Sequence, residues 1–149
     1  MNSLPERVQV LIEVPKGGFV KRELHEGGSV DFISPLPSPY NYGCVPELPG
    51  ADGDPQDVVV LGPRLRAGTR YDLPVVGVVR FFDAGAVDDK LIASDHAPTA
   101  AELRGLRRFF KLYALAKLVL NRRRGLSGRT ALVSVVERSA LQERWRNPR

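Results

Sequence analysis

Asp52-Gly53-Asp54-Pro55-Gln56-Asp57 leads without a break into Val58-Val59-Val60-Leu61. The apolar half is a short, β-branched run typical of a buried strand. The acidic half brings three carboxylates together, where they repel one another and lose hydration beside the strand. Bound cations would relieve that repulsion, whereas the Asp-Gly pair is also typical of a plain acidic surface turn.

Short apolar or alternating segments recur along the first two thirds of the chain, separated by Gly, Pro and Asp turns. We predict strands at 8–14, 19–24, 30–34, 58–61, 75–82, 91–94 and 130–137. The first two, divided by Pro15 and the Gly17-Gly18 pair, suggest a hairpin. This pattern favours a small closed or nearly closed antiparallel β-barrel, which is OB-like.

A long helix is predicted after Pro98, where Thr99 can cap it and Glu102 stands at the position of a capping box. Its end is expected near residues 122–125. The apolar positions follow a helical period at Leu103, Leu106, Phe110, Tyr113 and Leu120, which Lys117 interrupts. A shorter helix is predicted to open at Ser139, so the fold class is α+β.

The 149 residues are enough for one sizeable core, and we predict a single domain over residues 1–149. No run reaches the roughly 18 to 20 apolar residues of a membrane helix, and the N-terminus lacks the pattern of a signal peptide. The lone Cys44 cannot form an internal disulfide. We therefore expect a cytoplasmic protein without a membrane partner.

The net charge of +5 is unevenly distributed. Residues 1–98 contain 14 acidic and 9 basic side chains, whereas residues 99–149 contain 3 acidic and 13 basic ones. The basic end is typical of a solvated helix, and it could also steer an anionic substrate. It lacks the interleaved aromatic residues of nucleic-acid-binding segments, so a nucleic acid is not the expected partner.

A second acidic group, Asp83 with Asp88-Asp89-Lys90, follows one predicted strand and precedes another. Carboxylates at strand ends can converge at one mouth of a barrel. Such oxygen ligands suit Mg²⁺, with Mn²⁺ as an alternative, and neither histidine lies in a zinc-like cluster. An EF-hand loop that starts at Asp52 fits poorly, because Asp57 stands where the loop requires glycine. A nucleotide-binding P-loop motif is absent as well.

These motifs resemble those of the soluble family I inorganic pyrophosphatases, which carry an Asp-Gly-Asp-Pro-x-Asp signature. Further matching segments occur in the family's order over most of the chain. They are Ile12-Glu13-Val14-Pro15, Lys21-Arg22-Glu23, Asn41-Tyr42-Gly43, Val76-Gly77-Val78, Asp83 with Asp88 and Lys90, and Phe109-Phe110 with Tyr113.

The resemblance implies an inorganic diphosphatase that uses Mg²⁺ to hydrolyse diphosphate to two phosphates, and commonly a homo-oligomer. It implies that Asp54 is the general base. The implied metal-site residues are Asp52, Asp57, Asp83, Asp88 and Glu13, with Glu23 orienting metal-bound water. The residues implied to contact phosphate, or to position the acids that do, are Lys21, Tyr42, Lys90 and Tyr113.

Several family positions on the phosphate side are not matched. Phe32 stands in place of an arginine, Ser38 of a tyrosine, Ala84 of an acid or amide, and Ala114 of a lysine. Because Ala114 follows Tyr113, we expect its position to face the site; Arg22, Lys111 and Lys117 are candidates to compensate. The alternative function is a catalytically weakened, pyrophosphatase-like module that binds metal or a polyanion.

Overall fold

The computed structural model describes residues 4–18, 20–22, 30–33 and 38–144 of the chain. The strands are β1 (Arg7–Val14), β2 (Val20–Arg22), β3 (Val30–Ile33), β4 (Asn41–Pro49), β5 (Pro55–Val60), β6 (Arg70–Asp83), β7 (Ala86–Val87), β8 (Lys90–Ala93) and β9 (Ala131–Glu137). The helices are α1 (Ala100–Arg123) and α2 (Arg138–Arg144). Every predicted strand and both predicted helices have a counterpart here.

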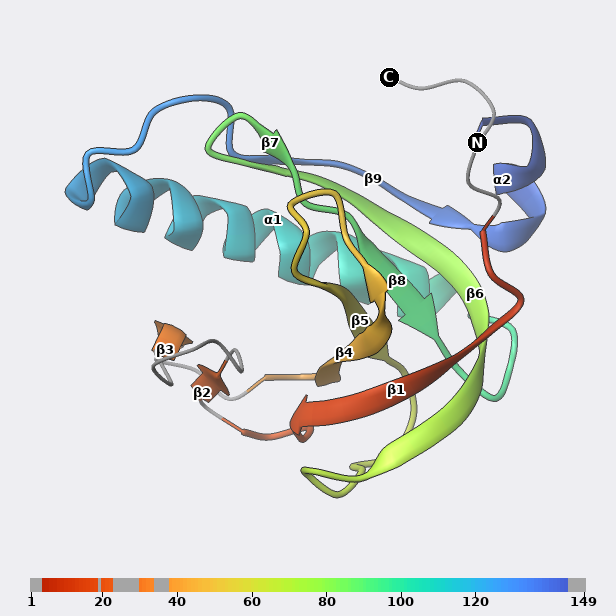
Figure 1. Ribbon diagram of the computed structural model, residues 1–149. Helices are drawn as coiled ribbons and strands as arrows, with labels where there is room; N and C mark the ends of the chain where they lie inside the picture. Colours follow the sequence, from red (N-terminus) through yellow and green to blue (C-terminus); the bar gives the residue numbers. More distant parts are fainter. Residues whose placement is uncertain (1–3, 19, 23–29, 34–37, 145–149) are drawn as a thin grey trace.

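Five strands close into a barrel in the order β1-β4-β5-β8-β6, because β6 also pairs with β1 (Figure 1). The predicted OB-like barrel with a long and a short helix is therefore confirmed. Its pairs are antiparallel except for β5 and β8, which run parallel with Val58 opposite Leu91 and Val60 opposite Ala93. That parallel pair places Asp57, the third residue of β5, beside Lys90, the first residue of β8.

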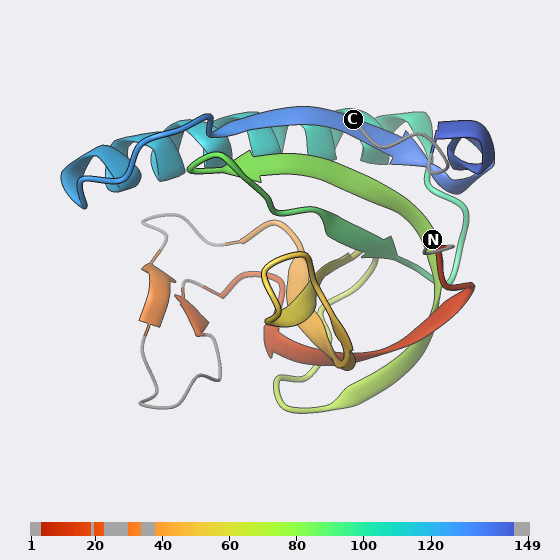
Figure 2. The same ribbon diagram turned by 45° about the horizontal axis from the view of Figure 1, so that its top comes forward.

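Strand β6 is long enough to pair with several other strands. Its first part pairs with β1, and its second part pairs with β8 on one edge and β9 on the other. Figure 2 shows β6 curving from the lower side of the barrel to the layer that contains β9 and α1. The barrel is thus connected directly to the helical layer.

The predicted hairpin between the first two strands is wrong, because β2 pairs with β3 instead of β1. After Pro15 the chain turns away from β1, and Gly17 adopts a φ of 89° that favours glycine. The Gly17 amide then donates to the Ser38 carbonyl, and the Ser38 amide donates to the Gly18 carbonyl. These bonds tie the turn to the segment that precedes β4.

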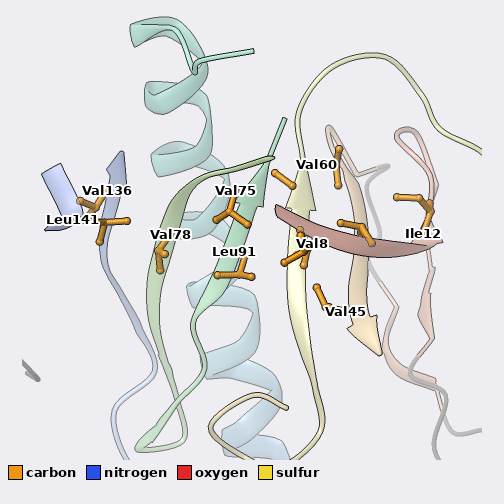
Figure 3. Packing of buried hydrophobic residues seen from close by; sticks show 12 residues of the cluster. Val8, Ile12, Val45, Val60, Val75, Val78, Leu91, Val136 and Leu141 are labelled. Carbon is orange, nitrogen blue, oxygen red and sulfur yellow. The ribbon is translucent and has the colours of Figure 1, made fainter. Parts of the chain in front are cut away.

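Apolar side chains are buried on both faces of the central strands, as alternation along a strand requires. Val60 packs in the barrel interior with Val8, Leu91 and other aliphatic residues (Figure 3), and Val58 belongs to the same buried cluster. Val59, between them, joins a second cluster that includes Phe110 and other buried residues of α1. Helix α1 therefore covers one outer face of the barrel and is held in a fixed position against it.

Helix α1 begins as predicted. The Glu102 amide donates to Thr99 Oγ1 at 3.1 Å, and the Thr99 amide donates to the Glu102 carboxylate at 3.0 Å. These two bonds form the capping box, which satisfies amides that the helix leaves unbonded. Neither helix in the described part of the chain has the length and apolar character needed to cross a membrane.

Candidate active site

A cavity of about 530 Å³ is lined by residues of the β4–β5 loop, the segment between β6 and β8, and α1. Its lining contains seven carboxylates, which are Glu13, Asp52, Asp54, Asp57, Asp83, Asp88 and Asp89. Six of the seven belong to the two acidic segments singled out in the sequence, and Glu13 comes from β1. The expected convergence of the two segments at one mouth of the barrel is observed.

Local hydrogen bonds and backbone geometry explain the sequence of the β4–β5 loop. Asp52 Oδ1 accepts a hydrogen bond from the Asp54 amide at 3.0 Å, and the Gly50 amide donates to the Asp54 carbonyl at 2.7 Å. Gly53 adopts a φ of 87°, which a residue with a side chain rarely takes. The segment is therefore a real Asp-Gly turn, and the same turn presents Asp52 and Asp54 to the cavity.

Lys90, Asp57 and Asp88 form a cluster that we call the strand corner. Lys90 is fully buried, and its Nζ lies 3.1 Å from Asp57 Oδ2 and 2.8 Å from Asp88 Oδ2. The parallel pairing of β5 and β8 produces this contact across the sequence. Burial by itself would lower the pKa of Lys90, but Tyr42, the two carboxylates and Tyr113 raise that pKa well above its ordinary value. Lys90 is therefore charged at neutral pH.

Lys117, Asp83 and Asn121 form a second cluster, the helix corner. Lys117 Nζ lies 3.3 Å from Asp83 Oδ2, and Asn121 Nδ2 donates to Asp83 Oδ1 at 2.7 Å. Both α1 residues are buried, with exposed fractions of 5% for Lys117 and 4% for Asn121. Asn121 also donates to Thr130 Oγ1 at 3.1 Å, which joins the end of α1 to the segment before β9. Asp83 is thus held from α1 on both of its oxygens.

The chemistry of these donors fits a hard divalent cation. All the acidic groups that face the cavity offer carboxylate oxygen, which Mg²⁺ and Mn²⁺ prefer. Within the described ranges, no three Asp, Glu, His or Cys side chains already converge on a single point as metal ligands do. Lys90 and Lys117 instead neutralise carboxylates in separate corners. The residues therefore match such an ion in type, and the carboxylates would have to move together around it.

The other predicted site residues fall into three groups. Glu13 and Tyr113 line the cavity. Tyr42 is buried in the cluster that joins the barrel to α1, and it interacts electrostatically with Lys90. Neither Tyr42 nor Lys90 is among the residues that line the cavity. Glu23 and the side chain of Lys21 lie outside the described residues.

The unmatched family positions have local explanations where the structure describes them. Ser38 Oγ donates to the Tyr40 carbonyl at 2.7 Å, and the Ala84 amide donates to Thr130 Oγ1 at 3.0 Å. Ser38 lies in the segment before β4 and Ala84 lies in the turn after β6, and neither is among the residues that line the cavity. The side chain of Phe32 lies outside the described residues.

The prediction that the side chain at position 114 faces the site is wrong. Ala114 is 7% exposed and belongs to the apolar cluster between α1 and the barrel. The residues of α1 that do line the cavity are Tyr113 and Lys117, four positions apart on the same face. The sequence signal for Lys117 was the interruption of the apolar period, but that signal does not say which group the ammonium meets. Arg70 also lines the cavity and carried no signal in the sequence, whereas Asp89 belongs to the second acidic segment but was not assigned a role.

Comparison with known proteins supports one family. A family model described as inorganic pyrophosphatase matches residues 10–140. The inorganic pyrophosphatase of Aquifex pyrophilus is 32% identical over 109 residues, covering 67% of this chain and 62% of the relative. That of Xylella fastidiosa is 38% identical over 99 residues, covering 62% of this chain and 56% of the relative. The chain thus spans about three-fifths of the length of the curated relatives it matches.

Solved structures extend the similarity over nearly the whole chain. The inorganic pyrophosphatase of Thermus thermophilus superposes with a TM-score of 0.75 and 26% identity, covering 98% of this chain and 91% of that one. The enzyme of Helicobacter pylori gives a TM-score of 0.71 at 24% identity, covering 95% and 94%, which supports the fold alone.

Proposed function

Because the chain belongs to the inorganic pyrophosphatase family, we propose that its acidic cavity hydrolyses inorganic diphosphate to two phosphates with the help of Mg²⁺. The observation that carries the proposal is the convergence of seven carboxylates from three parts of the chain on one cavity. An anion as dense in charge as diphosphate would be repelled from such a cavity unless cations enter with it. A metal-dependent reaction on a phosphate anhydride satisfies both charges at once.

The strand corner and its neighbours would hold the metal ions. The candidates are Asp52, Asp57, Asp83, Asp88 and Glu13, all of which line the cavity. When bound, Mg²⁺ supplies positive charge that draws in the diphosphate and makes water easier to deprotonate; Mn²⁺ suits the same ligands. Glu23 is proposed as an outer member of this group.

Asp54 is the proposed general base. It lines the cavity, and its backbone is held at both ends by the bonds to Asp52 and Gly50. The Asp54 carboxylate takes a proton from water as the water oxygen attacks one phosphorus atom and the bond from that phosphorus to the bridging oxygen breaks. A fixed loop keeps this carboxylate at the mouth of the cavity throughout the reaction.

The remaining predicted residues assist in two ways. Tyr113 lines the cavity and can donate its hydroxyl to a phosphate oxygen. Lys90 acts through Asp57 and Asp88, since its ammonium holds both carboxylates from the buried side. Tyr42 supports the same cluster, and Lys21 is proposed as a further phosphate contact.

Phosphate release from diphosphate tests this proposal. With saturating Mg²⁺, Asp54→Asn should lower the rate by about 100-fold or more, because loss of a general base typically costs that much. Asp72→Asn is the matched control, since Asp72 is exposed and pairs with Arg7 away from the cavity. Equal release by the wild type and Asp54→Asn, or no release by either, would sink the proposal.

A second candidate function has one observation in its favour. The outer face of α1 exposes a group of basic side chains, which are Arg104, Arg107, Arg108, Lys111, Arg122 and Arg123. A noncatalytic module could use this face to bind a polyanion. Binding to duplex DNA or to RNA that falls steeply with salt, together with no phosphate release, would favour this alternative. Absence of retention near physiological salt would count against it.

Cytoplasmic location and homo-oligomerisation stay predictions. The lone cysteine, buried in β4, agrees with a reducing compartment. Sedimentation of the purified chain over a range of concentrations measures the oligomeric state directly.

A further inference from the structure

Lys117 occupies an unusual place for a lysine. It lies on α1, whose other basic residues are exposed, yet only 5% of its surface reaches solvent. A buried ammonium is costly unless a negative group compensates for it. The inference below rests on the proposed function, because it concerns what this charge does in the same cavity.

The surroundings of Lys117 fix its ammonium at the cavity. Asp83 Oδ2 lies 3.3 Å from Lys117 Nζ, and both residues line the cavity. Asn121, one turn further along α1, donates to the other oxygen of Asp83. Asp83 is therefore clamped between two side chains of one helix, and the clamp prevents the lysine from extending into solvent.

The register of α1 explains why a lysine can reach the cavity from position 117 and not from position 114. Tyr113 and Lys117 are four residues apart and both line the cavity, whereas Ala114 is buried in the apolar cluster with Phe110 and Phe81. A cation at position 114 would meet the core. A cation at position 117 meets Asp83 and the cavity, next to the tyrosine proposed to contact phosphate.

We propose that Lys117 is an anion-binding residue of this cavity, which contacts a phosphate group of the bound diphosphate, and that Asp83 and Asn121 position it. In this arrangement Asp83 holds Lys117 in addition to its predicted place among the metal-site residues, while most of the other predicted metal ligands lie in the strand corner and the β4–β5 loop. The helix corner thus supplies a permanent protein cation on the side of the cavity where α1 lies.

Lys117→Met tests the proposal, since methionine keeps the length and apolar stem of the side chain and removes its charge. Lys117→Arg keeps the charge, and Lys111→Met removes an exposed lysine from the same helix. Calorimetry with methylenediphosphonate at saturating Mg²⁺ measures anion affinity without turnover. Titration with Mn²⁺ alone measures metal affinity.

Lys117→Met should weaken methylenediphosphonate binding by about tenfold or more, as expected for a lost charged hydrogen bond. Its Mn²⁺ affinity should be unchanged or higher. Lys117→Arg should recover most of the anion affinity, and Lys111→Met should stay within about twofold of the wild type. Asp83→Asn should weaken anion binding less than Lys117→Met does, because it loosens the lysine without removing it.

Unchanged anion affinity in Lys117→Met would overturn the proposal. A parallel fall in anion and Mn²⁺ affinity would also overturn it, because it would make Lys117 a structural residue only. Since binding is measured apart from turnover, the two proposals fail separately. Hydrolysis that survives with no anion defect in Lys117→Met removes this inference alone, whereas a clear anion defect without wild-type hydrolysis removes the proposed activity alone.

Discussion

The strand corner and the helix corner solve the same electrostatic problem with different parts of the fold. In the strand corner, fully buried Lys90 meets Asp57 and Asp88, and all three lie on or beside paired strands of the barrel. In the helix corner, Lys117 meets Asp83 across the gap between α1 and the end of β6. The first cluster depends on strand register, and the second depends on how α1 is rotated.

This difference suggests that the two clusters act on different ligands of the cavity. Lys90 lies behind the carboxylates and is not among the residues that line the cavity, so we expect it to act through the proposed metal ligands Asp57 and Asp88. Lys117 lines the cavity itself, so its charge is available to the anion. Substitutions in the strand corner should therefore change metal binding and stability, while substitutions in the helix corner should change anion affinity.

Lys90→Met should have the largest effect on stability. Removing one partner of a buried ion cluster leaves carboxylates without their cation, which costs about 3 kcal/mol of the free energy of unfolding. Mg²⁺ should return part of that loss, because it can replace the ammonium beside Asp57 and Asp88. Urea unfolding with and without Mg²⁺ measures both quantities, with Lys111→Met as the exposed control. A loss that Mg²⁺ does not reduce would break the link between this corner and metal binding.

Ala114→Lys comes next and tests the rotation of α1. A lysine here would enter the apolar cluster around Phe110, so we expect a loss of about 2 kcal/mol from overpacking and burial of a charge. The Michaelis constant for diphosphate should not fall. Thermal unfolding and steady-state kinetics check the two expectations. A lower Michaelis constant at full stability would mean that position 114 faces the cavity after all.

The features that the sequence predicts correctly are those whose signal lies within a few neighbouring residues. The capping box of α1 and the Asp-Gly turn are local, so Thr99, Glu102 and Gly53 identified them correctly. Strand β4 was not predicted because Pro46 and Pro49 interrupt its apolar pattern. In the structure the strand continues through both prolines, and its pairing with β5 becomes irregular between Val45 and Pro49.

The contacts that form the strand corner and the helix corner could not be predicted from local sequence signals. Nothing local indicates that β5 and β8 run parallel, although that pairing brings Lys90 to Asp57. Likewise, the helical period identified Lys117 as an interruption of the buried face without naming Asp83 as its partner. Motif resemblance predicted which acids share a site, whereas the partner of each lysine depends on tertiary packing.

Asn121→Ala should have a moderate effect. It removes the bonds to Asp83 and Thr130, and loss of buried hydrogen bonds of this kind costs about 1.5 kcal/mol of stability. Methylenediphosphonate affinity should fall less than in Lys117→Met, because the ammonium remains. Urea unfolding and calorimetry on the same sample measure both effects. An anion defect as large as that of Lys117→Met would show that Asn121 contacts the anion itself.

The smallest expected effect concerns pH at the N-terminal end of α1, away from both corners. Hydrogen bonds to Asp95 and to Glu102 raise the pKa of His96 above its ordinary value of 6.5, although slight burial opposes this. The charged histidine therefore stabilises the fold fully below about pH 6.5, and this contribution disappears as the pH rises through the raised pKa.

Thermal unfolding of the wild type and His96→Gln from pH 5.5 to 8.5 tests this expectation. The wild type should be the more stable protein at the acidic end, and the difference should shrink towards the alkaline end. Anion affinity at saturating Mg²⁺ should be equal in the two proteins throughout. A difference that grows with pH would show that the histidine contributes in its neutral form.

Above all, we expect the acidic cavity to cleave diphosphate only when Mg²⁺ accompanies it. Phosphorus-31 NMR of diphosphate mixed with the wild-type chain observes substrate and product together. The predicted result is steady replacement of the diphosphate resonance by a single phosphate resonance with Mg²⁺, and an unchanged diphosphate resonance when the metal is chelated. Persistence of the diphosphate resonance in the presence of Mg²⁺, or its loss at the same rate under chelation, would contradict the account.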